Sequence, residues 1–170
     1  DVIIHLAAVN RHESQEKLYE INVSLAQTLI YSLERTGSKP HIIVSSSTQE
    51  GRDNLYGASK KEVRRLFSNW ANQMNSCFTG MIIPNVFGPF GNPYYNSFIA
   101  TFSHQLTHGE QPQIDVDGQV KLIYLHELID VFLQEIRCKT GKSLLNIPHS
   151  SEHKVSEILE ILERYKVQYF

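Results

Sequence analysis

The sequence predicts an α/β fold in which helices flank a parallel β-sheet. Short apolar runs at residues 2–6, 42–44 and 78–83 are typical of strands that are buried on both faces. The segments between these runs carry apolar residues at helical spacing. Strand and helix therefore alternate from the first residue, which favours right-handed crossovers and a partial Rossmann-like, doubly wound parallel sheet.

The first helix is predicted over residues 15–35. Its apolar residues recur every three or four positions, and Gly37 follows them as a stop signal. The residues that share this apolar face are Leu18, Ile21, Leu25 and Leu29. Asn22 adjoins the face, where a lone asparagine usually makes a local hydrogen bond.

The stretch from Ser45 to Lys60 carries the strongest chemical signal. Three serines end the second predicted strand, and ligands of open α/β sheets bind beyond the carboxyl ends of the strands. A second helix begins near Tyr56, so Tyr56 and Lys60 share one helix face at i and i+4. A lysine ammonium beside a phenol lowers the pKa of the phenol, which suits a proton donor and acceptor near neutral pH. The alternative interpretation of this pair is a solvated helix face.

The rest of the chain mixes helices and strands. A loop rich in glycine, proline and asparagine occupies residues 84–97. Substrates often bind at such loops, although a plain surface loop has the same composition. A helix is predicted over residues 97–109, a hairpin over 114–124 with its turn at 117–118, and an amphipathic helix after it. A strand at 143–147 precedes a final helix that carries Val155, Ile158, Leu159 and Leu162.

Composition and charge are ordinary for a soluble globular protein. The 170 residues are 41% hydrophobic and 20% charged, with a net charge of −2, which allows one domain with a sizeable core. No block of lysine and arginine stands out, so nucleic acid is not an expected partner. No apolar run approaches the ~18 residues of a membrane-spanning helix, so no membrane contact is expected.

The cysteines and histidines do not predict a metal site. Cys77 and Cys138 match no disulfide or metal motif and are expected to be structural thiols in a reducing cytoplasm. His104 and His108 stand at i and i+4 on a predicted helix. The glutamate of a zinc protease motif is absent between them and no third ligand is evident, so no metal is predicted.

Four stretches, in this order, resemble the extended short-chain dehydrogenase/reductases, which include nucleotide-sugar epimerases, dehydratases and reductases. They are HLAAVN at residues 5–10, the helix that carries Asn22, the serine run followed by Tyr-Gly-Ala-Ser-Lys, and PNVFGP at 84–89. The resemblance covers residues 1–147. The short link between Ser47 and Tyr56 is most similar to that of bacterial reductases of UDP-linked 4-keto-6-deoxy sugars, which serve capsule and O-antigen synthesis.

The resemblance implies roles for individual residues. Tyr56 would protonate the substrate oxygen, Ser47 would hydrogen-bond it, and Lys60 would lower the tyrosine pKa and hold the nicotinamide ribose. Asn22 would hold a water in a proton relay. Cofactor contacts are expected at Leu6, Ala7, Ala8, Ser45, Ser46, Tyr56, Lys60, Pro84 and Val86. Substrate contacts are expected at Arg11, Asn85, Asn96, Ser97 and Lys121, the last standing where many members have an arginine.

The expected function is NADPH-dependent reduction of the C4 ketone of a UDP-linked 2-acetamido-6-deoxy sugar by a cytoplasmic homo-oligomer, with NAD as the alternative cofactor. Residues 1–83 are expected to form part of an NAD(P)-binding domain. Residues 84–170 are expected to form a small C-terminal substrate-binding lobe with the remaining sheet elements. A nucleotide-sugar epimerase or dehydratase, and a non-catalytic dinucleotide or sugar-nucleotide sensor, remain open.

One family feature is absent from the sequence. No G-x-x-G-x-x-G stretch occurs in the 170 residues. In a Rossmann domain this turn brings backbone N–H groups to the cofactor pyrophosphate. We therefore expect that, compared with the family, opening strands are missing and that the fragment alone is inactive.

Overall fold

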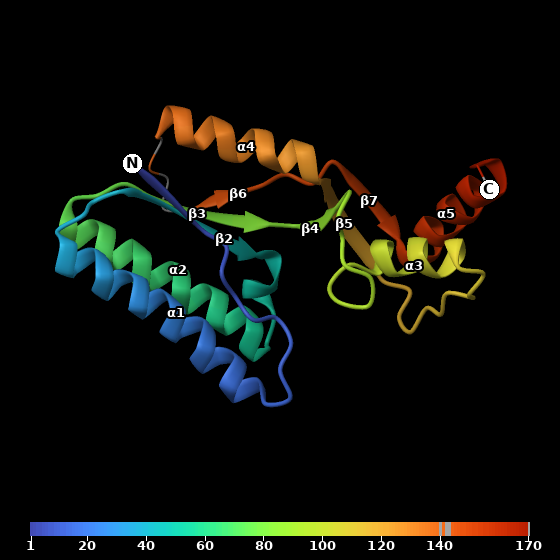
Figure 1. Cartoon of the computed structure of the whole chain (residues 1–170), viewed down its shortest axis with the longest axis horizontal. Helices are drawn as coiled ribbons and strands as arrows, with labels where there is room; N and C mark the ends of the chain where they lie inside the picture. Colours follow the sequence, from blue (N-terminus) through green and yellow to red (C-terminus); the bar gives the residue numbers. More distant parts are fainter. Residues whose placement is uncertain (140, 142–143, 170) are drawn as a thin grey trace. The chain divides into compact units, whose positions relative to one another are not determined.

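The structure is a computed structural model that describes residues 1–139, 141 and 144–169. The chain divides into two compact units. The first consists of residues 1–83 and 133–147, and the second of residues 84–132 and 148–170. Figure 1 shows the elements of both units in chain order.

The sheet of the first unit has the order β1-β2-β3-β6, and every pair in it is parallel. Its strands are β1 (Val2–His5), β2 (His41–Ser47), β3 (Phe78–Ile83) and β6 (Leu145–Asn146). The predicted α/β class and parallel sheet are confirmed. Of the strand predicted at 143–147, Ser143 lies outside the described residues. Because the strands are parallel, the ends of β1 and β2 meet at one edge of the sheet.

Two long helices cover one face of this sheet (Figure 1). They are α1 (Gln15–Thr36) and α2 (Leu55–Met74), and the end of α4 (Leu125–Cys138) lies on the opposite face. Ser14 caps α1 by accepting a hydrogen bond from the Lys17 N–H at 3.1 Å. Gly37, with φ of 65°, ends α1 in the left-handed conformation that glycine adopts without strain.

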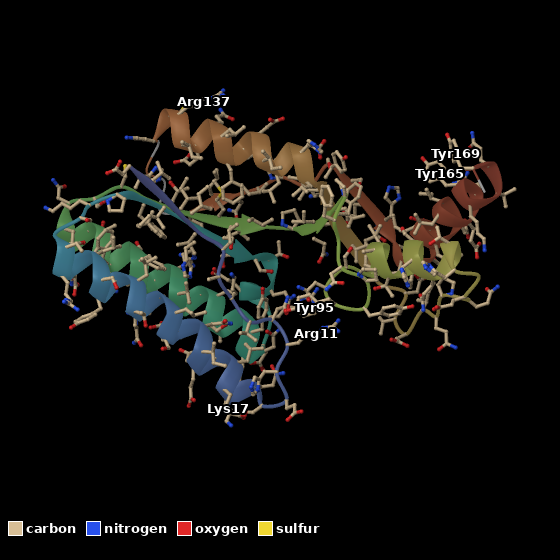
Figure 2. The ribbon with its side chains drawn as sticks, viewed as in Figure 1. Arg11, Lys17, Tyr95, Arg137, Tyr165 and Tyr169 are labelled. Carbon is tan, nitrogen blue, oxygen red and sulfur yellow. The ribbon has the colours of Figure 1, made fainter. Side chains whose placement is uncertain are left out.

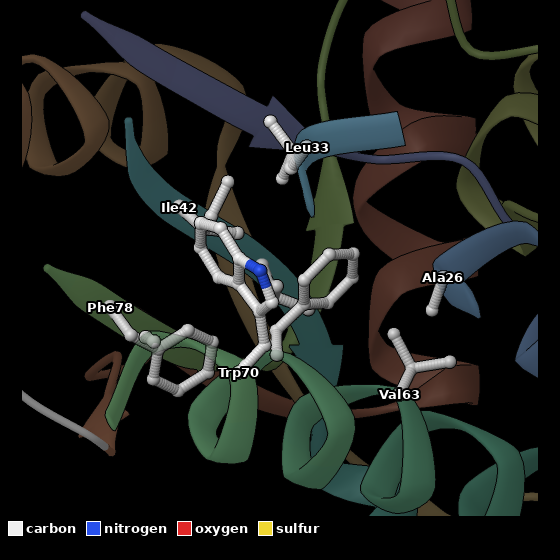
Figure 3. Packing of buried hydrophobic residues seen from close by; sticks show 9 residues of the cluster. Ala26, Leu33, Ile42, Val63, Trp70 and Phe78 are labelled. Atoms are coloured by element: carbon white, nitrogen blue, oxygen red, sulfur yellow. The ribbon is translucent and has the colours of Figure 1, made fainter. Parts of the chain in front are cut away.

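The core lies between the sheet and the helices α1 and α2. Figure 3 shows Trp70 and Val63 of α2 and Ile42 and Phe78 of the sheet in this layer. Phe67, also on α2, is fully buried. Burial of one such large apolar side chain contributes about 1.5–3 kcal/mol, so this layer fixes α2 firmly against the strands.

The second unit has a three-stranded sheet with the order β4-β5-β7, and it also contains the helices α3 (Phe98–Thr107) and α5 (Val155–Tyr169). Its strands are β4 (Asn85–Phe87), β5 (Gln119–Tyr124) and β7 (Ser151–Lys154), with β4 parallel and β7 antiparallel to β5. The hairpin predicted over 114–124 is therefore wrong. The antiparallel partner of β5 is β7, beyond α4 in the chain, and Asp117 instead accepts hydrogen bonds from Ser156 at the start of α5.

Candidate functional site

The three serines at the end of β2 have different surroundings. Ser45 donates a hydrogen bond from Oγ to the backbone carbonyl of His5 at 3.3 Å, which ties the ends of β2 and β1 together. Ser46 is buried and donates to the carboxylate of Glu50. Ser47 is half-buried, and its Oγ accepts a hydrogen bond from the Gln49 N–H at 3.2 Å. The Ser47 hydroxyl hydrogen can therefore point to another acceptor.

A short 3₁₀ turn, η1 (Thr48–Gly51), links the serine run to α2. Asn54 caps α2 by accepting from the Gly57 N–H at 2.7 Å. Gly57 is required at this point, since a Cβ there would lie 2.0 Å from the carbonyl oxygen of Gln49. This close approach fixes the start of α2, and with it Tyr56, against the turn that follows Ser47.

Lys60 is buried one helical turn after Tyr56. It is only 6% exposed, and within the described part of the chain its ammonium makes no hydrogen bond. Burial lowers the pKa of Lys60 from 10.5 to about 8, while the negative charge of Glu50 acts in the opposite direction. A buried ammonium without a protein acceptor is a donor that a bound hydroxyl group can satisfy.

Tyr56 behaves differently from the sequence-based expectation. Burial of the phenol raises the pKa of Tyr56 above its ordinary value of 10. The expected lowering of this pKa by Lys60 is therefore wrong for the folded chain, since burial of the phenol is the cause that sets the direction of the shift. At neutral pH the phenol is protonated, so Tyr56 can donate a proton.

The side chain of Asn22 holds the loop that follows β1. Its Oδ1 accepts from the Val9 N–H at 2.7 Å, and its Nδ2 donates to the Val9 carbonyl at 2.9 Å. The same Nδ2 donates to Oγ of Ser59 at 3.0 Å, and Ser59 in turn donates to the Tyr56 carbonyl at 2.7 Å. Asn22 thus connects the loop after β1 to the first turn of α2.

The expected cofactor contacts after β1 lie at the edge of the sheet where β2 also ends. Leu6 is 61% exposed and Ile4 is 40% exposed, so the expectation that the first strand is buried on both faces is wrong, and only His5 of β1 is buried. Ala7 is exposed and Ala8 is half-buried. His5 is buried against Phe67, and its Nε2 has no hydrogen-bond partner among the described residues. Burial and the charge of Lys60 lower the pKa of His5, so it is neutral near pH 7.

The other expected contacts are placed as follows. Arg11, labelled in Figure 2, is exposed on the loop between β1 and α1. Pro84 is buried in the second unit, and Asn85 and Val86 are exposed on β4. Asn96 is exposed, whereas Ser97 caps α3 by accepting from the Ala100 N–H at 3.3 Å. Lys121 is exposed on β5, in register with Glu152 of β7.

Several residues that hold this site together are not marked by any pattern that pointed to the site. Glu50 and Arg64 form a two-pronged ion pair beside the serine run, Ser59 connects Asn22 to α2, and Gly57 allows the close approach of the turn. Gly57 is the one with a usable signal, since a glycine in the first turn of a helix has a cost that needs a packing reason.

No cluster of three or more metal-ligating side chains occurs among the described residues. Nor does any helix in residues 1–139 and 144–169 combine the length and apolar character that crossing a membrane requires.

The site combines a serine run at the end of a parallel strand with a helix on which a tyrosine and a buried lysine lie one turn apart. This combination is typical of dinucleotide-dependent enzymes with a Rossmann-like fold. The chain belongs to the NAD dependent epimerase/dehydratase family, whose pattern matches residues 1–147. Within the family, it is 28% identical over 168 residues to a UDP-2-acetamido-2,6-beta-L-arabino-hexul-4-ose reductase of Pseudomonas aeruginosa. That alignment covers 98% of this chain and 45% of the relative.

Solved structures agree with this placement. The capsular polysaccharide assembling protein CapF of Staphylococcus aureus is 30% identical, with a TM-score of 0.83 over 98% of this chain and 46% of that one. RMD of Pseudomonas aeruginosa, solved with NADPH, shares the fold at a TM-score of 0.86 and 19% identity, over 98% of this chain and 67% of that one. The chain spans about half the length of the reductase and of CapF.

Proposed function

We propose that this chain supplies the catalytic residues of a reductase that converts the C4 ketone of a UDP-linked 2-acetamido-6-deoxy sugar to an alcohol, with NADPH as reductant. The observation that carries this proposal is the buried ammonium of Lys60, one turn after Tyr56, on the helix that begins directly after the serine run. The substrate class is supported by the similarity to the UDP-sugar 4-keto reductase of Pseudomonas aeruginosa and to the capsular polysaccharide assembling protein CapF.

The residues present fit the nicotinamide half of the cofactor. Lys60 offers a buried donor for a ribose hydroxyl, and the exposed Leu6 and the small Ala7 offer an apolar surface for a flat ring. Ser45 and Ser46 border the same strand end, and Pro84 and Val86 are proposed as further contacts. When bound, the nicotinamide supplies the hydride. The pyrophosphate half would need a glycine-rich turn that these 170 residues do not contain.

The proposed chemistry assigns one task to each side chain. Tyr56 donates its phenolic proton to the carbonyl oxygen as that oxygen gains negative charge. Ser47 donates a hydrogen bond to the same oxygen. Lys60 holds the ribose with a positively charged ammonium. The second lone pair of Asn22 Oδ1 is not used within the described chain, so Asn22 can also accept from a relay water.

On the substrate side we propose Arg11, Asn85, Asn96, Ser97 and Lys121 as contacts for the UDP-sugar. Arg11 and Lys121 carry positive charge suited to phosphate, and Ser97 begins α3, where backbone N–H groups favour an anion. A cytoplasmic homo-oligomer is part of the same proposal, as is the preference for NADP over NAD.

The test is an assay of the gene product, expressed with the coding sequence that flanks these residues. It uses a panel of UDP-4-keto sugars as substrates and NADPH deuterated at C4 of the nicotinamide as reductant. The proposal expects NADPH to be consumed and deuterium to appear at C4 of the sugar. Interconversion of UDP-sugars without net consumption of NADPH would indicate the epimerase instead. Binding without turnover would indicate the sensor.

A further inference from the structure

Glu50 sits at the centre of a group of side chains that joins the serine run to α2. Its carboxylate accepts a hydrogen bond from Ser46, the residue before Ser47. The guanidinium of Arg64, two helical turns into α2, donates from Nε to Oε1 at 3.0 Å and from Nη2 to Oε2 at 2.8 Å. The Glu50 side chain is 10% exposed and that of Arg64 is 21% exposed. Such a two-pronged, partly buried pair fixes geometry in a way that a surface pair does not.

The negative charge of Glu50 also acts on Lys60, whose pKa it raises against the effect of burial. Three elements place charged or titratable groups around this ammonium and its partner. His5 at the end of β1 faces Lys60, Glu50 of η1 attracts it, and Arg64 and Lys61 of α2 face Glu50. Burial alone would raise the pKa of Glu50, but the hydrogen bonds from Arg64 and Ser46 and the charges of Arg64 and Lys61 outweigh it, and the pKa is lowered. Glu50 is therefore negatively charged near neutral pH.

We propose that Glu50 is a positioning residue of this site: through its contacts with Ser46 and Arg64 it ties the serine run to α2, the helix that carries Tyr56 and Lys60, and its negative charge acts on the ammonium of Lys60. The effect of Glu50 on the pH dependence of catalysis rests on the proposed function. The coupling of Glu50 to Lys60 does not, because it is a property of the folded chain. The two parts can therefore fail separately.

The coupling is tested by NMR titration of lysine side chains labelled with ¹³C and ¹⁵N in the 170-residue chain, with Lys60→Met to assign the Lys60 signal. Wild type should titrate with a pKa of about 8 at Lys60. Glu50→Gln keeps the shape and removes the charge, so the Lys60 pKa should fall by about one pH unit. An unchanged Lys60 pKa in Glu50→Gln would overturn the proposal.

Two further variants separate charge from geometry. Glu50→Gln combined with Arg64→Gln leaves no unpaired guanidinium, and it should also lower the Lys60 pKa. Arg64→Gln alone breaks the tie but retains the carboxylate, so the Lys60 pKa should not fall. A fall as large as that in Glu50→Gln would contradict the assignment of the charge effect to Glu50.

The matched control is Glu62→Gln on the same helix. Glu62 pairs with Arg65 in an equally two-pronged fashion, at 2.8 and 2.6 Å, but Arg65 is 60% exposed. This change should leave the Lys60 titration unaltered. An equal fall of the Lys60 pKa in Glu62→Gln would show a general effect of net charge, and the specific role of Glu50 would be lost.

The catalytic part is read from the pH profile of the gene product with its flanking sequence. In Glu50→Gln the basic limb of kcat/KM should move to lower pH by the same amount as the Lys60 titration. If the Lys60 pKa falls but the basic limb stays, Glu50 positions the lysine and the lysine does not limit the reaction, which overturns the catalytic part alone. If wild type reduces no UDP-4-keto sugar, the proposed function fails while the NMR result stands.

Discussion

The side-chain amide of Asn22 donates a hydrogen bond to Oγ of Ser59 at 3.0 Å, across 37 positions of the sequence, and both side chains are buried. Through this contact, and through its two hydrogen bonds to Val9, Asn22 holds the loop after β1 against the first turn of α2. The proposed cofactor residues after β1 and the proposed catalytic residues on α2 therefore depend on one buried amide.

Asn22→Ala should lower the free energy of unfolding by about 2–4 kcal/mol, because it removes three hydrogen bonds and leaves buried groups without partners. Urea denaturation of the 170-residue chain measures this. The matched control is Asn72→Ala on the exposed side of α2, which should change stability by less than about 0.5 kcal/mol. Equal effects of the two substitutions would contradict the role given to Asn22.

Gly57→Ala should destabilise the chain by about 3 kcal/mol, because the new Cβ would lie 2.0 Å from the carbonyl oxygen of Gln49 and the backbone must shift. The control is Gly51→Ala, since an added Cβ there meets nothing within 4 Å. The midpoint temperature of thermal unfolding, measured for both variants and for wild type, checks this prediction. If Gly57→Ala is as stable as Gly51→Ala, the turn does not press on α2 as described.

Lys60→Met should stabilise the chain at neutral pH. The folded chain releases the Lys60 proton at about pH 8, whereas the unfolded chain retains it to about 10.5. The cost of burying the ammonium is therefore complete below pH 8 and disappears as the pH rises towards 10.5. The difference corresponds to about 3 kcal/mol.

The free energy of unfolding, measured against pH, checks this prediction. The gain from Lys60→Met should be largest at pH 7 and should shrink above pH 8. Lys61→Met, at the exposed neighbouring position, serves as the control and should show no such dependence. A gain that does not change between pH 7 and 10 would show that the stabilisation comes from apolar packing alone.

Local patterns predicted the first unit well, and long-range contacts explain what they missed. The apolar spacing of Leu18, Ile21 and Leu25 is a property of one helix, so α1 was found within one residue of its bounds. The hairpin prediction was wrong because apolar and polar residues alternate along β5 in the same way whether β5 pairs with the preceding residues or with β7.

The site shows the same division between local and tertiary information. The spacing of Tyr56 and Lys60 follows from the helical repeat, whereas the desolvation that raises the pKa of Tyr56 depends on packing that spacing does not encode. In the sequence, Glu50 belongs to the polar segment that joins Ser47 to Tyr56. Only the folded η1 turn brings it to Ser46 and Arg64, so no sequence pattern marked it.

NADPH should bind weakly to these 170 residues, because they contain the proposed nicotinamide contacts without a glycine-rich turn for the pyrophosphate. Calorimetric titration of the isolated chain is compared with the gene product that carries its flanking coding sequence. We expect tight binding in the second protein only. Equal micromolar affinity in both would mean that the cofactor site is built from other residues.

Tyr56→Phe in the gene product with its flanking sequence tests whether the phenol of Tyr56 protonates the substrate. Phenylalanine retains the ring and removes the proton donor. The control is Tyr31→Phe on the exposed face of α1. We predict that kcat falls roughly 10²–10⁴-fold in Tyr56→Phe while the dissociation constant for NADPH is unchanged. Turnover within a few-fold of wild type would contradict it.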